Sequence, residues 1–292
     1  MKGVSIILTA YHTEKFIKPC LDSIKVQTYF KTHKNYEILL GIDGCEETLN
    51  KVKEIHKNYP NLEVYYFENN VGTYIVSNTL CSIAKYDTLI RFDTDDIMLK
   101  DMVERMVKCA DDNNSDFLLA KTKDLNGTNS YTAQGHILIR KDVFEKYGGF
   151  QPFRCACDYE LRMRLSKFVK VKFANIIVSH CRTRQDSLTK KKDTSMASNY
   201  RNNIHGFIRW ETAQLKKKED AVIKCVVENP KKLLDDNTLS ETIEVNVPKN
   251  QVLKNLYETW QNLPEKDRKV ETNNTSGRYI KVKACSGFNV FY

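Results

Sequence analysis

The chain has 292 residues, of which 41% are hydrophobic and 28% are charged, and its formal net charge is +9. This length predicts one domain with an ample core and an appendage, without internal repeats or low-complexity tracts. No apolar run is long enough to cross a bilayer, and the first residues lack a signal-peptide pattern. We therefore expect a cytoplasmic protein without a transmembrane segment, with peripheral contact to a membrane surface left open.

The nine cysteines are scattered and form no CxxC pair, which excludes the usual pattern of a structural zinc site. Cys155 and Cys157 make a lone CxC without accompanying ligands. We interpret the cysteines as free, buried thiols in a reducing compartment.

Strand and helix patterns alternate along the first part of the chain. Residues 2–11 form a β-branched run that ends in a polar turn, and apolar residues recur at helical spacing over 16–24. Further buried strands are predicted over 36–42, just before Asp43, and over 64–67. This alternation predicts an α/β fold with a doubly wound, mostly parallel sheet flanked by helices.

The most informative segment is 86–96, a short apolar strand that ends in three carboxylates, Asp93, Asp95 and Asp96. Like charges repel and each carboxylate loses hydration on burial, so packing does not account for the group. Mg²⁺ or Mn²⁺ would relieve the conflict, because hard cations bind carboxylate and phosphate oxygens. Ligands of open α/β sheets bind beyond the carboxyl ends of strands. The segment therefore predicts a metal–phosphate site, and the alternative is an acidic turn that caps a helix near Leu99.

Eight short segments follow one another along the chain at 4–12, 20–28, 37–44, 70–78, 92–96, 148–150, 158–164 and 182–189. Taken together and in this order, they resemble the family 2 glycosyltransferases, which have the GT-A fold. The resemblance covers residues 1–189. It implies metal-dependent, inverting transfer of a sugar from a nucleotide-diphosphate donor, with a UDP-sugar favoured, to a hydroxyl of a glycan, lipid or protein.

The resemblance implies a donor-binding role for residues at the ends of the first two strands. Asp43 corresponds to the carboxylate that holds the base of the donor, and a carboxylate can accept from a ring N–H. Thr9 and Tyr11 lie where the family contacts the base. The alternative for Asp43 is that it only forms a turn. The alternative for Thr9 and Tyr11 is that they only end the strand. Ser77 stands where many relatives carry arginine, so one donor contact is missing or comes from elsewhere.

The same resemblance makes Asp93 and Asp95 a DxD motif that Asp96 extends. It implies that members of this group bind Mn²⁺ or Mg²⁺. Which of the three bind the metal stays open, with Asp95 favoured.

Basic residues are concentrated after residue 161, where 162–193 contains ten Lys or Arg and two Asp. Arg182 and Arg184 match a segment that lies near the donor diphosphate in the family, and arginine binds phosphate oxygens bidentately. Arg184 replaces a histidine that is sometimes a metal ligand, and His180 is a candidate substitute.

Asp158 matches the catalytic base of the family and precedes a helical stripe of Leu161, Leu165 and Phe168. Its alternative role is an N-cap. Gly149 and Phe150 match the acceptor side, where the ring could stack on a sugar; the alternative is a plain turn. The implied chemistry is inversion, with Asp158 taking the proton of the acceptor hydroxyl.

We divide the chain into a GT-A domain over 1–204 and a small α+β appendage over 205–292. Within the appendage, alternation predicts strands over 243–247 and 280–284, and an apolar stripe predicts a helix over 252–260. The role of the appendage and the oligomeric state stay open.

Three other functions are compatible with parts of the sequence. A catalytically silent binding module on the same fold is disfavoured by the intact carboxylates. Nucleic-acid binding, suggested by the basic charge, would need a phosphate-tracking stripe, and we expect no nucleic-acid partner. A nucleotidyltransferase would need a Gly-rich basic loop after the first strand, and residues 10–14 do not form one.

Overall fold

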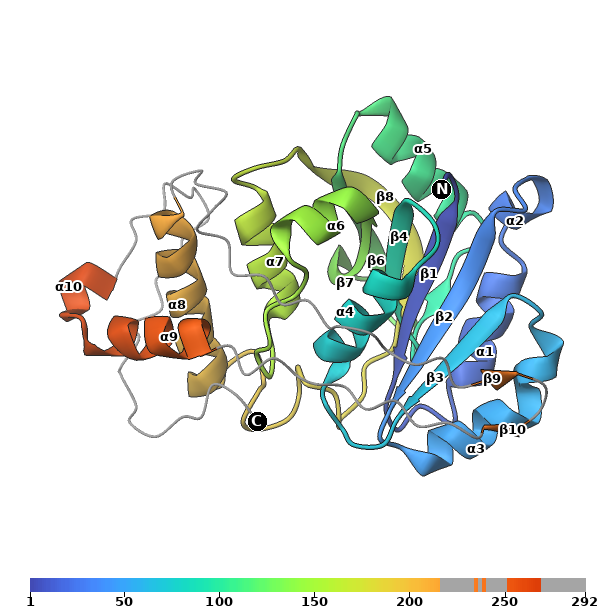
Figure 1. Ribbon diagram of the computed structural model, residues 1–292, viewed down its shortest axis with the longest axis horizontal. Coiled ribbons are helices and arrows are strands. Elements are labelled where there is room, and N and C mark those ends of the chain that lie inside the picture. Colours follow the sequence, from blue (N-terminus) through green and yellow to red (C-terminus); the bar gives the residue numbers. More distant parts are fainter. Residues whose placement is uncertain (216–233, 236–237, 240–250, 269–292) are drawn as a thin grey trace.

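The computed structural model describes residues 1–215, 234–235, 238–239 and 251–268 (Figure 1). Within these residues no helix is both long and apolar enough to span a bilayer. An eight-stranded sheet forms the centre. Across the sheet, the strands follow the order β3 (Leu62–Phe67), β2 (Tyr36–Asp43), β1 (Val4–Ala10), β4 (Thr88–Asp93), β7 (Ser130–Arg140), β6 (Phe117–Asp124), β8 (Val171–Cys181) and β5 (Ile97–Met98).

The sheet is mostly parallel. β1, β2, β3 and β4 are parallel to one another, and β6 is parallel to β8. β7 is antiparallel to both β4 and β6, and β5 is antiparallel to β8. The predicted α/β fold with a mostly parallel sheet is therefore confirmed, and the four strands predicted before residue 94 are present as β1 to β4.

Helices cover both faces of the sheet and create two hydrophobic cores. Side chains alternate between the faces along a strand, so Ile7 and Leu39 enter one core while Ile6 and Leu8 enter the other. The first core contains residues of α4 (Thr73–Ile83), α6 (Lys141–Tyr147) and α7 (Cys157–Leu165), and the second contains residues of α1 (Ile17–Lys25), α3 (Glu46–Ile55) and α5 (Met102–Asp112). Two short helices follow in the chain, α2 (Tyr29–Thr32) after α1 and η1 (His56–Asn58) after α3.

Two local expectations need correction. Asp101 is the N-cap of α5, and residues 93–96 lead into β5, so the acidic segment does not cap that helix. Leu161 and Leu165 are fully buried as expected, but α7 ends before Phe168. The cysteines of the described residues are free, as predicted, and most of them are buried, including Cys155 and Cys157, whereas Cys109 and Cys181 are only partly buried.

The C-terminal part begins with α8 (Asn199–Gln214), which crosses the proposed boundary at residue 204. The helix predicted over 252–260 is present as α9 (Gln251–Asn262), and its Tyr257 and Trp260 pack on Phe207 of α8. A short antiparallel pair, β9 (Leu234–Asp235) and β10 (Thr238–Leu239), and α10 (Glu265–Arg268) are also described. The strands predicted over 243–247 and 280–284 lie outside the described residues, and the domain division stays a prediction.

Candidate active site

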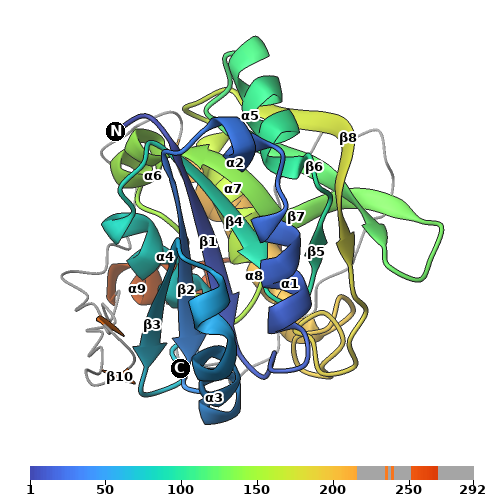
Figure 2. The same cartoon turned by 90° about the vertical axis from the view of Figure 1, so that its right-hand side faces the viewer.

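The carboxyl ends of β1, β2 and β4 meet at one edge of the sheet because these strands are parallel. Thr9, near the end of β1, pairs with Gly41 of β2 on one side and with Asp93 of β4 on the other. The chain moves outward from β1 to β2 and β3 and then returns to β4 beyond β1 (Figure 2). Open α/β sheets bind ligands at such a reversal of strand order. The residues predicted at these strand ends are therefore brought together.

Asp93 is held by an arginine from its own strand. Nη2 of Arg91 lies 2.7 Å from Oδ1 of Asp93. The buried guanidinium also donates to the carbonyl of Gly135 at 2.8 Å and to Oγ1 of Thr73 at 3.2 Å. Burial alone would raise the pKa of Asp93, but Arg91 and the nearby His136 hold it below its ordinary value. Asp93 is therefore ionised and fixed in position.

Asp96 is buried, and both of its oxygens have partners. Oδ1 accepts a hydrogen bond of 2.7 Å from the backbone N–H of Arg182, and Oδ2 lies 2.9 Å from Nε2 of His136. His136 is only 1% exposed, and its Nδ1 lies 3.0 Å from Oγ of Ser179. Asp96 therefore ties the acidic segment to β7 and to the loop after β8.

Asp95 has fewer partners than the other two carboxylates. Its Oδ2 lies 3.3 Å from Nη1 of Arg184, the one ion pair that Asp95 makes within the described residues. Burial, followed by the charges of Asp93 and Asp96, raises the pKa of Asp95 to about 6. A divalent cation would remove this repulsion, so the residues fit Mg²⁺ or Mn²⁺ at Asp95 and Asp93.

Asp43 lies at the end of β2, is 2% exposed, and organises the loop that precedes α4. Its two oxygens accept from the backbone N–H groups of Val71 at 2.7 Å and Gly72 at 3.0 Å. Burial raises its pKa to about 6, although both hydrogen bonds act in the opposite direction. Each oxygen keeps a second lone pair for a ligand N–H.

The two other residues predicted to contact the base differ in exposure. Oγ1 of Thr9 lies 2.6 Å from Oγ1 of Thr73, so this side chain is already engaged. Tyr11 is 41% exposed, and its ring lies 4.2 Å from that of His12. Tyr11 therefore offers a ring face to a ligand, whereas Thr9 connects β1 to α4.

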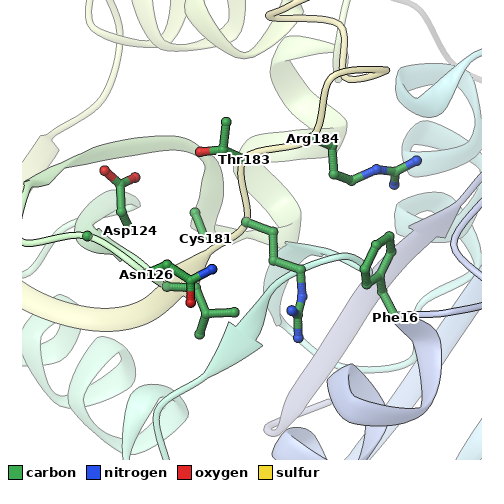
Figure 3. A pocket seen from close by; sticks show the side chains of 9 residues that line it. Phe16, Asp124, Asn126, Cys181, Thr183 and Arg184 are labelled. Atoms are coloured by element: carbon green, nitrogen blue, oxygen red, sulfur yellow. The ribbon is translucent and has the colours of Figure 1, made fainter.

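A pocket of about 380 Å³ flanks the acidic segment and is lined by Phe16 and by residues 124–127 and 181–184 (Figure 3). The guanidinium carbons of Arg182 and Arg184 each lie 5.2 Å from the centre of the Phe16 ring. Nη2 of Arg184 also donates to the carbonyl of His12 at 3.1 Å. Arg184 also pairs through Nε and Nη2 with the carboxylate of Asp186, and the backbone N–H of Arg182 bonds Asp96. Both predicted arginines therefore lie near the acidic segment, and Arg184 would have to exchange carboxylate partners for phosphate oxygens.

Asp158 is the second residue of α7, and Ala156 is the N-cap with a φ of 65°. The alternative role of Asp158 as the N-cap is therefore wrong. Oδ1 of Asp158 accepts from the hydroxyl of Tyr74 at 3.4 Å and from the backbone N–H of Tyr159 at 2.9 Å. Asp158 is partly exposed, and both of its hydrogen bonds within the described residues are made by Oδ1.

The structure places Phe150 differently from the sequence-based expectation. Phe150 is 1% exposed, and its ring packs 5.2 Å from that of Tyr74. Asn78 fixes this turn, because its side chain bonds both the N–H and the carbonyl of Phe150 at 2.8 Å. Gly149 has a φ of 64°, and a Cβ there would lie 2.6 Å from Oδ1 of Asn78. The ring is therefore not available to stack on a sugar, and we leave it out of the proposed site.

Sequence reasoning missed Arg91, Tyr74 and His136. Arg91 did give a signal, because it is a charge inside a segment that otherwise reads as a buried strand. His136 gave none, since it lies 40 residues after Asp96 on a strand that was not predicted. Among the described residues, Asp96, His136 and Cys181 form a group whose possible metal-ligand atoms all lie within 4.8 Å of one another. His180, the substitute ligand suggested by the sequence, does not belong to this group.

Known proteins share this sequence pattern and this fold. The chain is 31% identical over 126 residues to the poly(ribitol-phosphate) beta-glucosyltransferase of Bacillus spizizenii, which is 42% of this chain and 20% of that protein. It is also 31% identical over 130 residues to the poly(ribitol-phosphate) beta-N-acetylglucosaminyltransferase TarS of Staphylococcus aureus, which is 44% of this chain and 22% of that protein. The matched part is thus about a fifth of these relatives.

Solved structures agree at the level of the fold. S. aureus TarS 1–349 in complex with UDP-GlcNAc superposes with a TM-score of 0.63 and 18% identity, over 75% of this chain and 70% of that one. The mannosyltransferase PcManGT of Pyrobaculum calidifontis, in complex with GDP-Man and Mn²⁺, superposes with a TM-score of 0.54 and 14% identity, over 74% of this chain and 63% of that one. The sheet is therefore of the GT-A type.

The sequence profile of glycosyl transferase family 2 matches residues 5–169. This span runs from β1 to the end of α7 and includes the strand ends, the acidic segment and Asp158. Because the match covers more than half of the chain, the protein belongs to glycosyl transferase family 2.

Proposed function

We propose that the protein transfers a sugar from a nucleotide-diphosphate donor, with a UDP-sugar favoured, to a hydroxyl group, with inversion at the anomeric carbon. The observation that carries this proposal is the convergence of Asp95 and Asp93 with Arg184 at the strand edge where Asp43 also lies. The complexes of TarS with UDP and UDP-GlcNAc support the choice of base.

In this proposal the donor lies across the carboxyl ends of β1, β2 and β4. Asp43 accepts from a ring N–H of the base, and Tyr11 packs against the base or the ribose. Arg182 and Arg184 face the diphosphate, since guanidinium groups bind phosphate oxygens in a fork geometry. The loop that Asp43 holds through Val71 and Gly72 is thereby ordered before the donor binds.

Asp95 and Asp93 would hold Mn²⁺ or Mg²⁺, and the bound cation would offset the negative charge that develops on the departing diphosphate. The side chain of Asp96 is 8% exposed, against 36% for Asp93 and 23% for Asp95, and both of its oxygens have protein partners. We therefore assign Asp96 a positioning role rather than a place among the metal ligands. This assignment narrows the three candidate ligands to two.

Asp158 acts as the general base. The acceptor hydroxyl attacks the anomeric carbon from the face opposite the diphosphate, and its proton passes to the free oxygen of Asp158. The hydroxyl of Tyr74 donates to Oδ1, which orients the carboxylate. Tyr74 in turn lies 5.8 Å from the guanidinium carbon of Arg91. The buried Arg91 thus contacts both Asp93 and the ring of Tyr74, which orients the proposed general base Asp158.

The proposal is tested by measuring UDP binding with and without Mn²⁺ in the wild type and in Asp95→Asn. A ligand at about 100 times its Kd adds roughly 2.7 kcal/mol to stability, which a thermal-shift assay resolves. We expect Mn²⁺ to tighten UDP binding in the wild type and to have little effect in the variant, because an amide is a much weaker ligand for a hard cation.

The matched control is Asp112→Asn, which removes an exposed carboxylate from the end of α5. It should keep the full effect of Mn²⁺. An equal gain from Mn²⁺ in Asp95→Asn and in the wild type would refute the metal-binding role, and absence of UDP and GDP binding to the wild type would refute the donor assignment.

A further inference from the structure

Arg162 and His205 both contact the ring of Tyr159, the residue after Asp158. Arg201, His205 and Arg209 are spaced four residues apart on α8 and therefore share one face of that helix. α8 packs against α7, which carries Arg162 (Figure 1). We call Arg162, Arg201, His205 and Arg209 the arginine cluster.

The guanidinium of Arg162 is held in a fixed orientation. Its carbon lies 5.0 Å from the ring centre of Tyr159 and 5.7 Å from that of Phe173. Its Nε donates to Oε1 of Gln134 at 3.1 Å. Arginine between aromatic rings keeps its terminal N–H groups free for a partner in the plane of the guanidinium. Within the described residues, no partner of these terminal groups is present.

The arginine cluster also lacks a carboxylate partner within the described residues. Asp158 and Arg162 have the four-residue spacing of a helix ion pair, but Nε of Arg162 donates to Gln134, and Oδ1 of Asp158 accepts from Tyr74 and Tyr159 instead. Arg201 donates to the carbonyls of Thr194 at 2.8 Å and Leu188 at 3.2 Å, which leaves its charge uncompensated. Like charges four residues apart on a helix repel. The sequence therefore places unpaired positive charge here at a cost in stability.

The positive charges of the three arginines act on the pKa of His205. Burial, and then the charges of Arg201, Arg209 and Arg162, lowers the pKa of His205 to about 4. Its ring lies 4.6 Å from that of Tyr159, the residue after Asp158. A neutral imidazole can still donate one hydrogen bond to an anion. The cluster thus combines fixed charge, a neutral donor and aromatic faces next to the proposed base.

We infer that the arginine cluster binds a phosphate group carried by the acceptor, so that the acceptor is a phosphorylated polyol or sugar whose reacting hydroxyl lies near Asp158. This inference rests on the proposed function and specifies its acceptor. Arg162 and Arg209 would contact the phosphate oxygens, and the more deeply buried Arg201 would contribute its charge. A phosphate offers several oxygens to several guanidinium groups, which a neutral hydroxyl acceptor does not.

The test uses glycerol 3-phosphate as the probe and glycerol as its uncharged match. Both are titrated into the full chain in the presence of saturating UDP and Mg²⁺, so that the donor phosphate positions are filled, and the Kd is taken from the shift in melting temperature. We expect binding of glycerol 3-phosphate only, weakening with added salt. The double variant Arg162→Gln with Arg209→Gln should raise its Kd at least about tenfold.

The control Lys108→Gln removes an exposed positive charge on α5 and should leave the Kd unchanged. Arg162→Lys keeps the positive charge but loses the planar guanidinium that can bind two phosphate oxygens at once. Its Kd should lie between that of the wild type and that of the double variant. An unchanged Kd in the double variant would overturn the inference, as would a loss that appears in Arg182→Gln instead. If UDP does not bind, the proposed function fails, and the same titration of the free protein still decides whether the cluster binds phosphate.

Discussion

Replacing Glu211 by glutamine should stabilise the protein at neutral and alkaline pH. Glu211 lies on α8, is 3% exposed, and accepts from Nε2 of Gln151 at 2.9 Å. Oε2 of Glu211 and Oε1 of Gln151 are both buried without a hydrogen-bond partner among the described residues. Burial, followed by the charge of Glu160, raises the pKa of Glu211 from 4.5 to about 7. The folded protein therefore favours the protonated carboxyl, which resembles an amide.

The magnitude follows from the two pKa values. Between pH 4.5 and 7 the folded state keeps the proton of Glu211 while the unfolded state releases it, so the folded state loses stability as the pH rises. At 1.36 kcal/mol for each pH step, a difference of about 2.5 corresponds to a loss of about 3 kcal/mol. An amide at 211 does not ionise, and its NH₂ group can donate to the unpaired oxygen of Gln151. We expect Glu211→Gln to recover most of this loss above pH 7.

The assay is urea denaturation of the wild type and Glu211→Gln at pH 5, 6, 7 and 8. The two proteins should have similar free energies of unfolding at pH 5, and the variant should be more stable by up to about 3 kcal/mol at pH 8. Glu54→Gln, at a side chain that is 63% exposed, is the control and should follow the wild type. A variant that is no more stable than the wild type at pH 8 would refute the reasoning.

Two predictions concern the proposed active site. Asp158→Asn should keep a near-normal melting temperature and donor affinity but lower transfer by at least about 10²-fold, because the amide cannot accept the proton; transfer or slow donor hydrolysis measures this, and an unchanged rate would exclude Asp158 as the base. Asp43→Asn should weaken UDP binding in calorimetry and also lower stability by about 1–3 kcal/mol, because one of the N–H groups of Val71 and Gly72 loses its acceptor. An unchanged UDP affinity would make Asp43 a turn residue only.

The sequence by itself determined the elements whose pattern is local. The β-branched run of β1 and the apolar stripe of α1 are recognisable because a strand repeats every two residues and a helix every 3.6. Three carboxylates within four positions at the end of β4 are unusual in any context, so the acidic site was recognisable before the fold was known. The position of Asp43 at a strand end followed in the same way.

Only the tertiary structure decided how the site residues are paired. His136 reaches Asp96 because β7 lies antiparallel beside β4, and the backbone of Arg182 reaches it from 86 residues away. The same applies to Phe150, whose ring enters the core through a turn held by Asn78, and to the arginine cluster shared by α7 and α8. Periodicity shows which face of an element is buried, but strand order and register determine which distant side chain meets that face. These contacts therefore distinguish Asp93, Asp95 and Asp96, which look alike in the sequence, and the proposed roles of the three carboxylates rest on them.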